Sequence, residues 1–354
     1  MGQDALDRDA LKAFAVRLMG VYGGAVLAQM VDLGARTGLT ATLADAPGTS
    51  DELAERAGLQ PRYVEEWLGA MVTGGIVTHD AGVFTLPPEH AACLVGDSFY
   101  NTSAMARAIA NGNQHNGVLA DAFREGGGIA YGDQPGDIVG LLDAMGRARY
   151  DTFLVDAYLT VDDELVRLLR DGADVCDVGC GAGHATNLIA QAYPEASVVG
   201  VDRNPDALEA ARAEAAEMGL DNVRYEVADA ADLETGSLDV VTAFDVIHDL
   251  SHPRETIAAI AGALRPGGTF LLYDASAPSD LDAQAELPWA TMMYGISVNA
   301  CLANALAGGE DAEGWGPMYP RAGVEQALAE AGFELAGVHP VKGDPMNALY
   351  VARR

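Results

Sequence analysis

A glycine-rich turn between a short apolar strand and a helix is the feature of this sequence with the clearest chemical meaning. The predicted strand covers residues 174–178, the helix begins near His184, and Gly179, Gly181 and Gly183 lie between them. Glycine lacks a Cβ, so the backbone can adopt left-handed angles and a ligand can approach it closely. The first N–H groups of the following helix have no partner within the helix and can bind that ligand. The turn therefore predicts a ligand-binding loop.

An acid at the end of the next predicted strand indicates what kind of ligand this is. Residues 196–201 are mostly apolar and lead into Asp202, at the spacing where an acid binds a ribose hydroxyl. A dinucleotide-binding loop needs glycine or alanine three places after its second glycine, but His184 stands there. We therefore expect a nucleoside-containing ligand that is not a dinucleotide.

Four motifs in order, over roughly residues 166–275, resemble those of the class I S-adenosylmethionine (SAM)-dependent methyltransferases. They are Asp202, the Asp229-Ala230 pair, the segment 244–249 and the turn 264–268 before a fifth strand, and they accompany the Asp177 to Gly183 loop, which resembles the first motif of that family. The resemblance implies SAM as cofactor and S-adenosylhomocysteine (SAH) as product. The cofactor-binding residues that it implies are Asp177, Gly179, Cys180, Gly181, Gly183, Asp202, Arg203, Asp229, Ala230 and Asp245.

The pair His248-Asp249 is the candidate for acid–base chemistry. It stands where plant-type O-methyltransferases carry His-Asp-Trp, with Leu250 in place of the tryptophan. In those enzymes the histidine deprotonates the acceptor, which implies O-methylation with His248 as general base. Alternatively, His248 forms hydrogen bonds within its own loop, and a sulfur or nitrogen acceptor is methylated without a base.

A metal site at this histidine is not expected from the sequence. His248 and His252 have the spacing of two ligands on one helix face, but Pro253 disfavours helical angles at the residue before it. We therefore predict that no metal is bound.

The first 97 residues predict a winged helix. Helices are expected over residues 11–25 and from 25 to about 38, a third is capped by Ser50, and a fourth starts at Pro61. Residues 76–86 then predict a hairpin. The layout is similar to that of small-molecule O-methyltransferases of plants and bacteria, which implies a homodimer formed by this domain.

A winged helix also raises the alternative of a transcriptional regulator that senses SAM. The helix that would enter DNA carries Glu65 and Glu66 against a single Arg62, and phosphate binding depends on cationic side chains. We therefore expect no binding of nucleic acid.

Residues 98–165 predict a mostly helical linker or lid. Gly126–Gly128 followed by Tyr131 are either a plain loop or a hinge that lays the tyrosine ring over the sulfonium of SAM, since ring faces attract cations. With the second interpretation Tyr131 joins His248 and Asp249 as a catalytic residue. His115 lies upstream as a candidate for substrate binding.

The fold class expected for residues 166–354 is α/β, a Rossmann-like seven-stranded methyltransferase domain that follows the α-helical winged helix. Residues 333–338 and 348–351 are similar to its closing antiparallel strands. An insertion over residues 276–316 would cap the carboxyl ends of the strands, where open α/β sheets bind ligands. Its candidate substrate-binding residues are Trp289, Met293 and Tyr294, although this face could instead pack on the N-terminal domain.

The formal net charge of -31 over 354 residues is extreme, with Lys12 and Lys342 as the lysines. Such a surface repels nucleic acid and anionic membranes. It resembles the surfaces of proteins from salt-accumulating halophiles, and an acidic proteome with arginine-rich codon use is the alternative. We see neither an apolar run of membrane-spanning length nor a basic N-terminus, which predicts a cytoplasmic enzyme acting on a small molecule.

Overall fold

The structure, a computed structural model, describes residues 6–134 and 138–354 of the chain. It divides into two compact units, the first ending at Asn111 and the second beginning at Gly112. The division between the two units falls near the end of helix α6 (Ser103–Gly112). The bounds expected from the sequence, a first domain over residues 1–97 and a linker over 98–165, stay a prediction.

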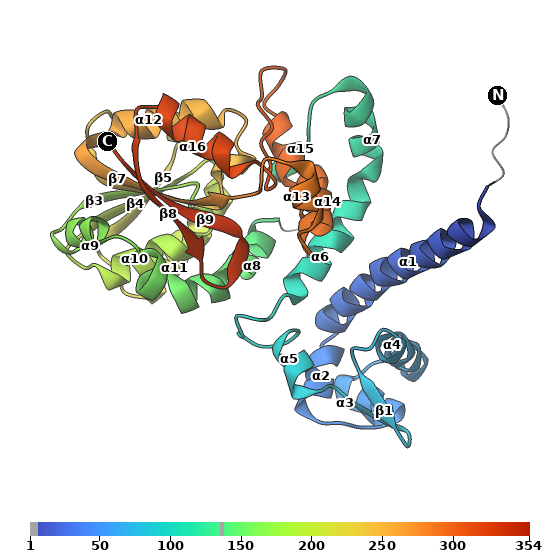
Figure 1. The fold of residues 1–354 in the computed structure, drawn as a ribbon. Coiled ribbons are helices and arrows are strands. Elements are labelled where there is room, and N and C mark those ends of the chain that lie inside the picture. Colours follow the sequence, from blue (N-terminus) through green and yellow to red (C-terminus); the bar gives the residue numbers. More distant parts are fainter. Residues whose placement is uncertain (1–5, 135–137) are drawn as a thin grey trace. The chain divides into compact units, whose positions relative to one another are not determined.

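A seven-stranded sheet forms the centre of the second unit, in the order β5-β4-β3-β6-β7-β9-β8 (Figure 1). Strands β3 to β7 are parallel, whereas β9 pairs antiparallel with both β7 and β8. The strands are β3 (Asp174–Val178), β4 (Ser197–Asp202), β5 (Val223–Val227), β6 (Leu238–Phe244), β7 (Leu264–Ala275), β8 (Glu334–Val341) and β9 (Asp344–Arg353). The predicted fold class, with a closing antiparallel pair of strands, is confirmed.

Helices cover both faces of this sheet, which explains why its central strands are rich in valine and other apolar residues. Side chains of α12 and α16 form one core layer with the sheet, and side chains of α9 and α10 form the other (Figure 1). The helices of the second unit are α7 (Asn116–Glu125), α8 (Ile138–Phe153), α9 (Asp163–Arg170), α10 (His184–Ala192), α11 (Pro205–Glu217), α12 (Pro253–Ala263), α13 (Leu281–Ala285), α14 (Ala290–Asn299), α15 (Cys301–Leu306) and α16 (Arg321–Glu330).

The first unit contains the predicted winged-helix elements. They are α1 (Arg8–Arg36), α2 (Leu39–Asp45), α3 (Ser50–Ala57), α4 (Pro61–Thr73), the hairpin β1 (Thr78–Asp80) and β2 (Val83–Thr85), and α5 (Pro88–Ala92). Their shared core is formed around Leu53, Leu68 and Met71, which are buried.

Two details of this unit differ from the sequence prediction. The two helices expected before residue 38 are one helix, α1, because Asp7 caps its start and it continues through Gly23 and Gly24. A glycine inside a helix costs only about 1 kcal/mol, less than a proline does. The cap of α3 is Thr49 rather than Ser50, since Thr49 and Glu52 form a reciprocal capping box.

Helix α1 is also long and apolar enough to cross a membrane, with a mean hydropathy of 1.4 over its most apolar window. The expectation that no apolar run reaches that length is therefore wrong. A single helix of this kind near the N-terminus is weak evidence for a membrane, because core helices and signal sequences have the same composition.

Candidate active site

The glycine loop follows β3 and has the left-handed backbone that its sequence predicts. The φ angles are +66° at Gly179, +53° at Gly181 and +76° at Gly183. A Cβ added at Gly183 would lie 2.4 Å from the Cβ of Ala211, so this glycine lets helix α10 approach α11 closely. A Cβ added at Gly181 would meet no protein atom within 4 Å. The loop is therefore packed tightly at Gly183 and open at Gly181, where a ligand can approach.

Asp202 lies beside this loop at the end of β4. Its Oδ2 accepts a hydrogen bond from the Gly181 N–H at 2.9 Å, and its Oδ1 accepts one from the Asn204 N–H at 2.8 Å. A carboxylate offers about four acceptor positions, so two remain for hydroxyl donors of a ligand. Asp202 thus positions the loop and retains acceptor capacity.

Two more predicted cofactor residues meet Asp202 at the same edge of the sheet. Asp229 follows β5, caps a turn that begins at Ala230 and lies 3.6 Å from the guanidinium of Arg203. Both charged side chains are substantially exposed to solvent. The carboxyl ends of β4 and β5 therefore bring together Asp202, Arg203 and the Asp229-Ala230 pair.

Asp177 supports the loop from inside the protein. Its carboxylate is buried and accepts hydrogen bonds from the hydroxyls of Thr186 at 2.5 Å and Thr242 at 2.8 Å. Burial raises the pKa of Asp177 to about 6, although both hydroxyls act in the opposite direction. Asp177 therefore links β3 to β6 and to the helix behind the glycines, while Cys180 beside it is half-buried.

Asp245 follows β6 with a φ of +61°, an angle that is uncommon for any residue except glycine. Its amide donates to the carbonyl of Tyr273 at 2.7 Å, and its Oδ1 accepts from Asn347 Nδ2 at 3.3 Å. The half-buried guanidinium of Arg149 lies 3.7 Å from Asp245 and 3.0 Å from Asp344. The sequence reasoning missed Arg149, since a single arginine within a helix carries no motif.

His248 lies between two carboxylates in the buried turn Ile247–Asp249. Its Nδ1 lies 2.7 Å from Asp274 Oδ1, and its Nε2 lies 3.0 Å from Asp249 Oδ1. Asp274 Oδ2 also accepts hydrogen bonds from the backbone of the turn. Burial alone would lower the pKa of His248, but the two carboxylates raise it well above its ordinary value. The site therefore holds a fixed imidazole that is a strong base.

Tyr131 joins this group through its hydroxyl, which donates to Asp249 Oδ2 at 2.5 Å. Its backbone N–H donates to the side-chain oxygen of Asn304, whose Nδ2 in turn donates to the carbonyl of Asp249. The Cys301 thiol lies in the same group, within 4.8 Å of the nearest donor atoms of His248 and Asp249. All three predicted catalytic residues thus meet.

The sequence missed Asp274, Cys301 and Asn304 as members of this site. Asp274 carried a signal, because it is a polar residue near the carboxyl end of a parallel strand, where ligands bind in such sheets. The proximity of Cys301 to His248 depends on how the insertion after β7 folds.

The four predicted substrate-binding residues do not join this group directly. His115 is buried, with its Nε2 2.8 Å from the carbonyl of Asn299. Trp289 and Met293 are half-buried and pack around Ala290 and its neighbours. Tyr294 is exposed, and its hydroxyl donates to the side chain of Gln284.

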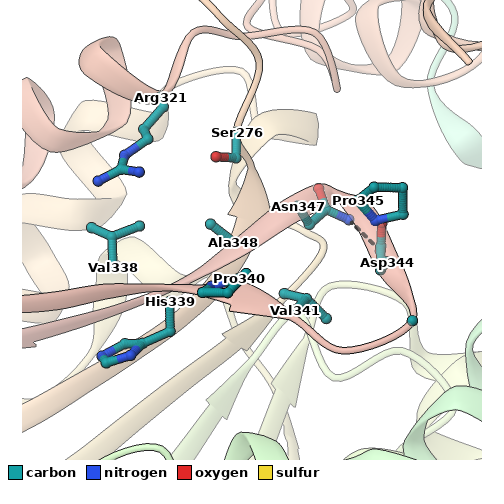
Figure 2. A pocket seen from close by; sticks show the side chains of 11 residues that line it. Ser276, Arg321, Val338, His339, Pro340, Val341, Asp344, Pro345, Asn347 and Ala348 are labelled. Atoms are coloured by element: carbon teal, nitrogen blue, oxygen red, sulfur yellow. Dashed lines mark hydrogen bonds between the residues drawn. The ribbon is translucent and has the colours of Figure 1, made fainter. Parts of the chain in front are cut away.

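A cavity of about 610 Å³ lies elsewhere, along the hairpin β8–β9 (Figure 2). Its polar lining residues include Ser276, Arg321, His339 and Asn347. None of the candidate site residues predicted from the sequence lines it, and the glycine loop follows β3, which β6 and β7 separate from β9. We therefore centre the site on the glycine loop and His248.

Comparison with known proteins identifies both parts of the chain. Residues 169–323 match a methyltransferase domain, and residues 25–96 match an Rv2258c-like winged helix-turn-helix domain. The trans-aconitate 2-methyltransferase of Methylobacterium nodulans is 35% identical over 123 residues, which are 34% of this chain and 46% of that protein. The ubiquinone biosynthesis O-methyltransferase of Erwinia tasmaniensis is 36% identical over 99 residues, 27% of this chain and 40% of that protein. The chain thus spans less than half the length of the curated relatives it matches.

Solved structures match over nearly the whole chain. The mitomycin 7-O-methyltransferase MmcR has a TM-score of 0.73 at 19% identity and covers 98% of this chain and 99% of its own. Human N-acetylserotonin methyltransferase in complex with SAM has a TM-score of 0.65 at 19% identity and covers 100% and 99%. The chain therefore contains a methyltransferase domain that follows a winged helix-turn-helix domain, and its fold over both domains is similar to that of these solved structures.

Proposed function

We propose that this protein transfers the methyl group of SAM to a hydroxyl group of a small molecule. The observation that supports this most strongly is the buried His248, held between Asp249 and Asp274 at the carboxyl ends of β6 and β7. The glycine loop and Asp202 lie at the same edge of the sheet, after β3 and β4. When bound, SAM supplies an electrophilic methyl group on a sulfonium.

The residues around the glycine loop fit this cofactor. The open space at Gly181 allows a ligand to approach the backbone closely, and Asp202 retains acceptor positions for the ribose hydroxyls. Asp229 and Ala230 would lie beside the adenine, with Arg203 paired to Asp229. Asp177 would act through the loop, because both of its oxygens already accept hydroxyls.

The chain's contribution to the reaction is to align the acceptor and to remove its proton. Alignment supplies much of the catalysis when two groups must meet in line. The Nε2 atom of His248 would accept the hydroxyl proton, and the carboxylates of Asp249 and Asp274 would stabilise the imidazolium that forms. Tyr131, hydrogen-bonded to Asp249, would hold that carboxylate in place.

Substitution of His248 tests this assignment. The His248→Ala variant should bind SAH as the wild type does, while SAH release with a panel of phenols falls by roughly two to four orders of magnitude. His252→Ala is the matched control, because it removes a half-buried histidine four residues away from His248. Near-normal turnover of the His248→Ala variant, or activity confined to thiols, would favour S-methylation, for which no base is needed.

The N-terminal unit supports a second element of the proposal, a homodimer. Large apolar side chains on α1 are more than half exposed, among them Phe14, Val21 and Tyr22. An exposed apolar surface of this kind marks an interaction site. On α4, Arg62 is neutralised by Glu65 and Glu66, which leaves no cation on this side of the helix to bind phosphate. We therefore propose a cytoplasmic dimer rather than a DNA-binding regulator.

A further inference from the structure

Within the part of the chain that the structure describes, one group of side chains has the donor types and spacing of a metal site. It consists of His248 Nε2, Asp249 Oδ1 and Cys301 Sγ, which all lie within 4.8 Å of one another. The first two residues come from the turn after β6, and the third begins helix α15. His252, the partner considered from the sequence, is not part of the group.

Asp249 Oδ1 is the unusual atom of this group. It is buried, and its contacts are with the side chains of the group itself, while Oδ2 of the same carboxylate accepts the Tyr131 hydroxyl. A buried carboxylate oxygen needs a proton donor or a cation beside it. His248 Nε2 lies 3.0 Å away, and the contact of Nδ1 with Asp274 favours a hydrogen on Nδ1. A cation bound between Nε2 and Oδ1 would take the place of a proton there, and it would be attracted by the carboxylate charge in the same way.

We propose that a thiophilic divalent cation such as Zn²⁺ binds His248, Asp249 and Cys301 and thereby blocks the proposed general base. Cysteine, histidine and aspartate are all ordinary zinc ligands, whereas Mg²⁺ and Ca²⁺ prefer oxygen alone. A tetrahedral zinc ion holds such donors about 3.3–3.6 Å apart, so a small side-chain rotation closes the group. Binding releases the thiol proton of Cys301, and any proton on His248 Nε2, to the buffer.

Neighbouring side chains fix the orientation of His248 and Asp249, as they commonly do for metal ligands in proteins. A ligating histidine usually donates its second N–H to a carboxylate, which is the place of Asp274 at Nδ1. Asp249 is fixed at its backbone by Asn304 and at its side chain by Tyr131. The three donors leave a fourth coordination position for water or for an acceptor oxygen.

The predicted loss of activity rests on the proposed function, in which His248 is the general base, whereas the predicted metal binding does not. Occupation of the Nε2 lone pair leaves His248 unable to accept a proton. Binding of the ion itself depends only on the three side chains, so it can be measured separately from catalysis.

Cadmium is a suitable first probe, because a cadmium–thiolate bond has a charge-transfer absorption in the ultraviolet. Titration of the full-length protein with Cd²⁺ should produce this band and saturate at one equivalent. The Cys301→Ser variant should lose the band, and its affinity for Zn²⁺, measured by calorimetry, should fall at least about tenfold. Cys93→Ser is the matched control, since it removes an exposed thiol and should keep both signals.

The outcomes separate the site from the mechanism. The proposed metal site is overturned if the wild type shows no band. It is also overturned if the band persists in Cys301→Ser and disappears in Cys93→Ser. In either case only a proton lies between His248 and Asp249. Zn²⁺ should also stop SAH release by the wild type, reversibly on addition of a chelator. If one equivalent binds through Cys301 and turnover is unchanged, the metal site stands and the assignment of His248 as the base is overturned.

Discussion

The most direct test of the cofactor site is a methyl group placed at Gly181. At a φ of +53° an alanine is strained, at a cost of roughly 1–2 kcal/mol. No protein atom lies within 4 Å of the new Cβ, so a steric clash adds nothing to this cost. For a unit of this size, each kcal/mol lowers Tm by about 2–4 °C, which gives a fall of roughly 2–8 °C. The Gly181→Ala protein should therefore fold.

Its affinity for the cofactor should nevertheless fall, because the new methyl group occupies the space through which the ligand approaches the backbone. We expect SAH, measured by calorimetry, to bind at least about tenfold more weakly, a loss of about 1.4 kcal/mol. Gly179 is unsuitable for this test, since a Cβ there would lie 2.3 Å from Val246 Cγ2.

Gly236 provides a matched control. It has a φ of +65°, its Cβ would also meet no atom within 4 Å, and it precedes the amino end of β6, away from the site. Gly236→Ala should show the same fall in Tm and no change in SAH affinity. If Gly181→Ala binds SAH as tightly as Gly236→Ala does, the cofactor does not approach this glycine and the site is wrongly placed.

Two further predictions concern pH and assembly. The pKa of Asp177 is about 6 in the folded protein against 3.8 for the ordinary side chain, so the folded state holds this proton more tightly. The protonated Asp177 therefore contributes its full stabilisation below pH 4, and this contribution is lost as the pH rises through 6. Measured with denaturant, the free energy of unfolding of the wild type, relative to that of Asp177→Asn, should fall by about 3 kcal/mol over this window. A difference between the two proteins that stays constant with pH would contradict this prediction. On α1, the double variant Phe14→Glu, Tyr22→Glu should be a monomer in light scattering, whereas the wild type should be a dimer. If the wild type is itself a monomer and cosediments with lipid vesicles, α1 is a membrane helix instead.

Features that depend on neighbouring residues could be predicted from the sequence. The left-handed angles of the glycine loop follow from the residue type, and the contact of Asp202 with Gly181 follows from two adjacent parallel strands. The strands themselves were visible as short apolar runs, because helices cover both faces of the sheet. These local rules explain why the fold class and the cofactor loop were predicted together.

Features that depend on distant segments could not be predicted in the same way. The sequence identified His248 but not Asp274, which lies 26 residues further along the chain and fixes Nδ1. Nor could it place Cys301, whose position depends on the fold of the insertion after β7. The continuity of α1 was also missed, although the helix is capped by Asp7 and contains no proline, so that its internal glycines do not break it.

The surroundings of His248 also show why a residue type alone does not define a role. A histidine with one carboxylate neighbour is oriented, and a second carboxylate at the other nitrogen makes it a stronger base. The same negative charge attracts any cation, and the thiol of Cys301 adds a preference for soft ones. A protein that strengthens its base in this way therefore also creates a site where a metal ion competes with the proton. Whether the proton or the metal occupies that site depends on Cys301, which is why its substitution separates the two.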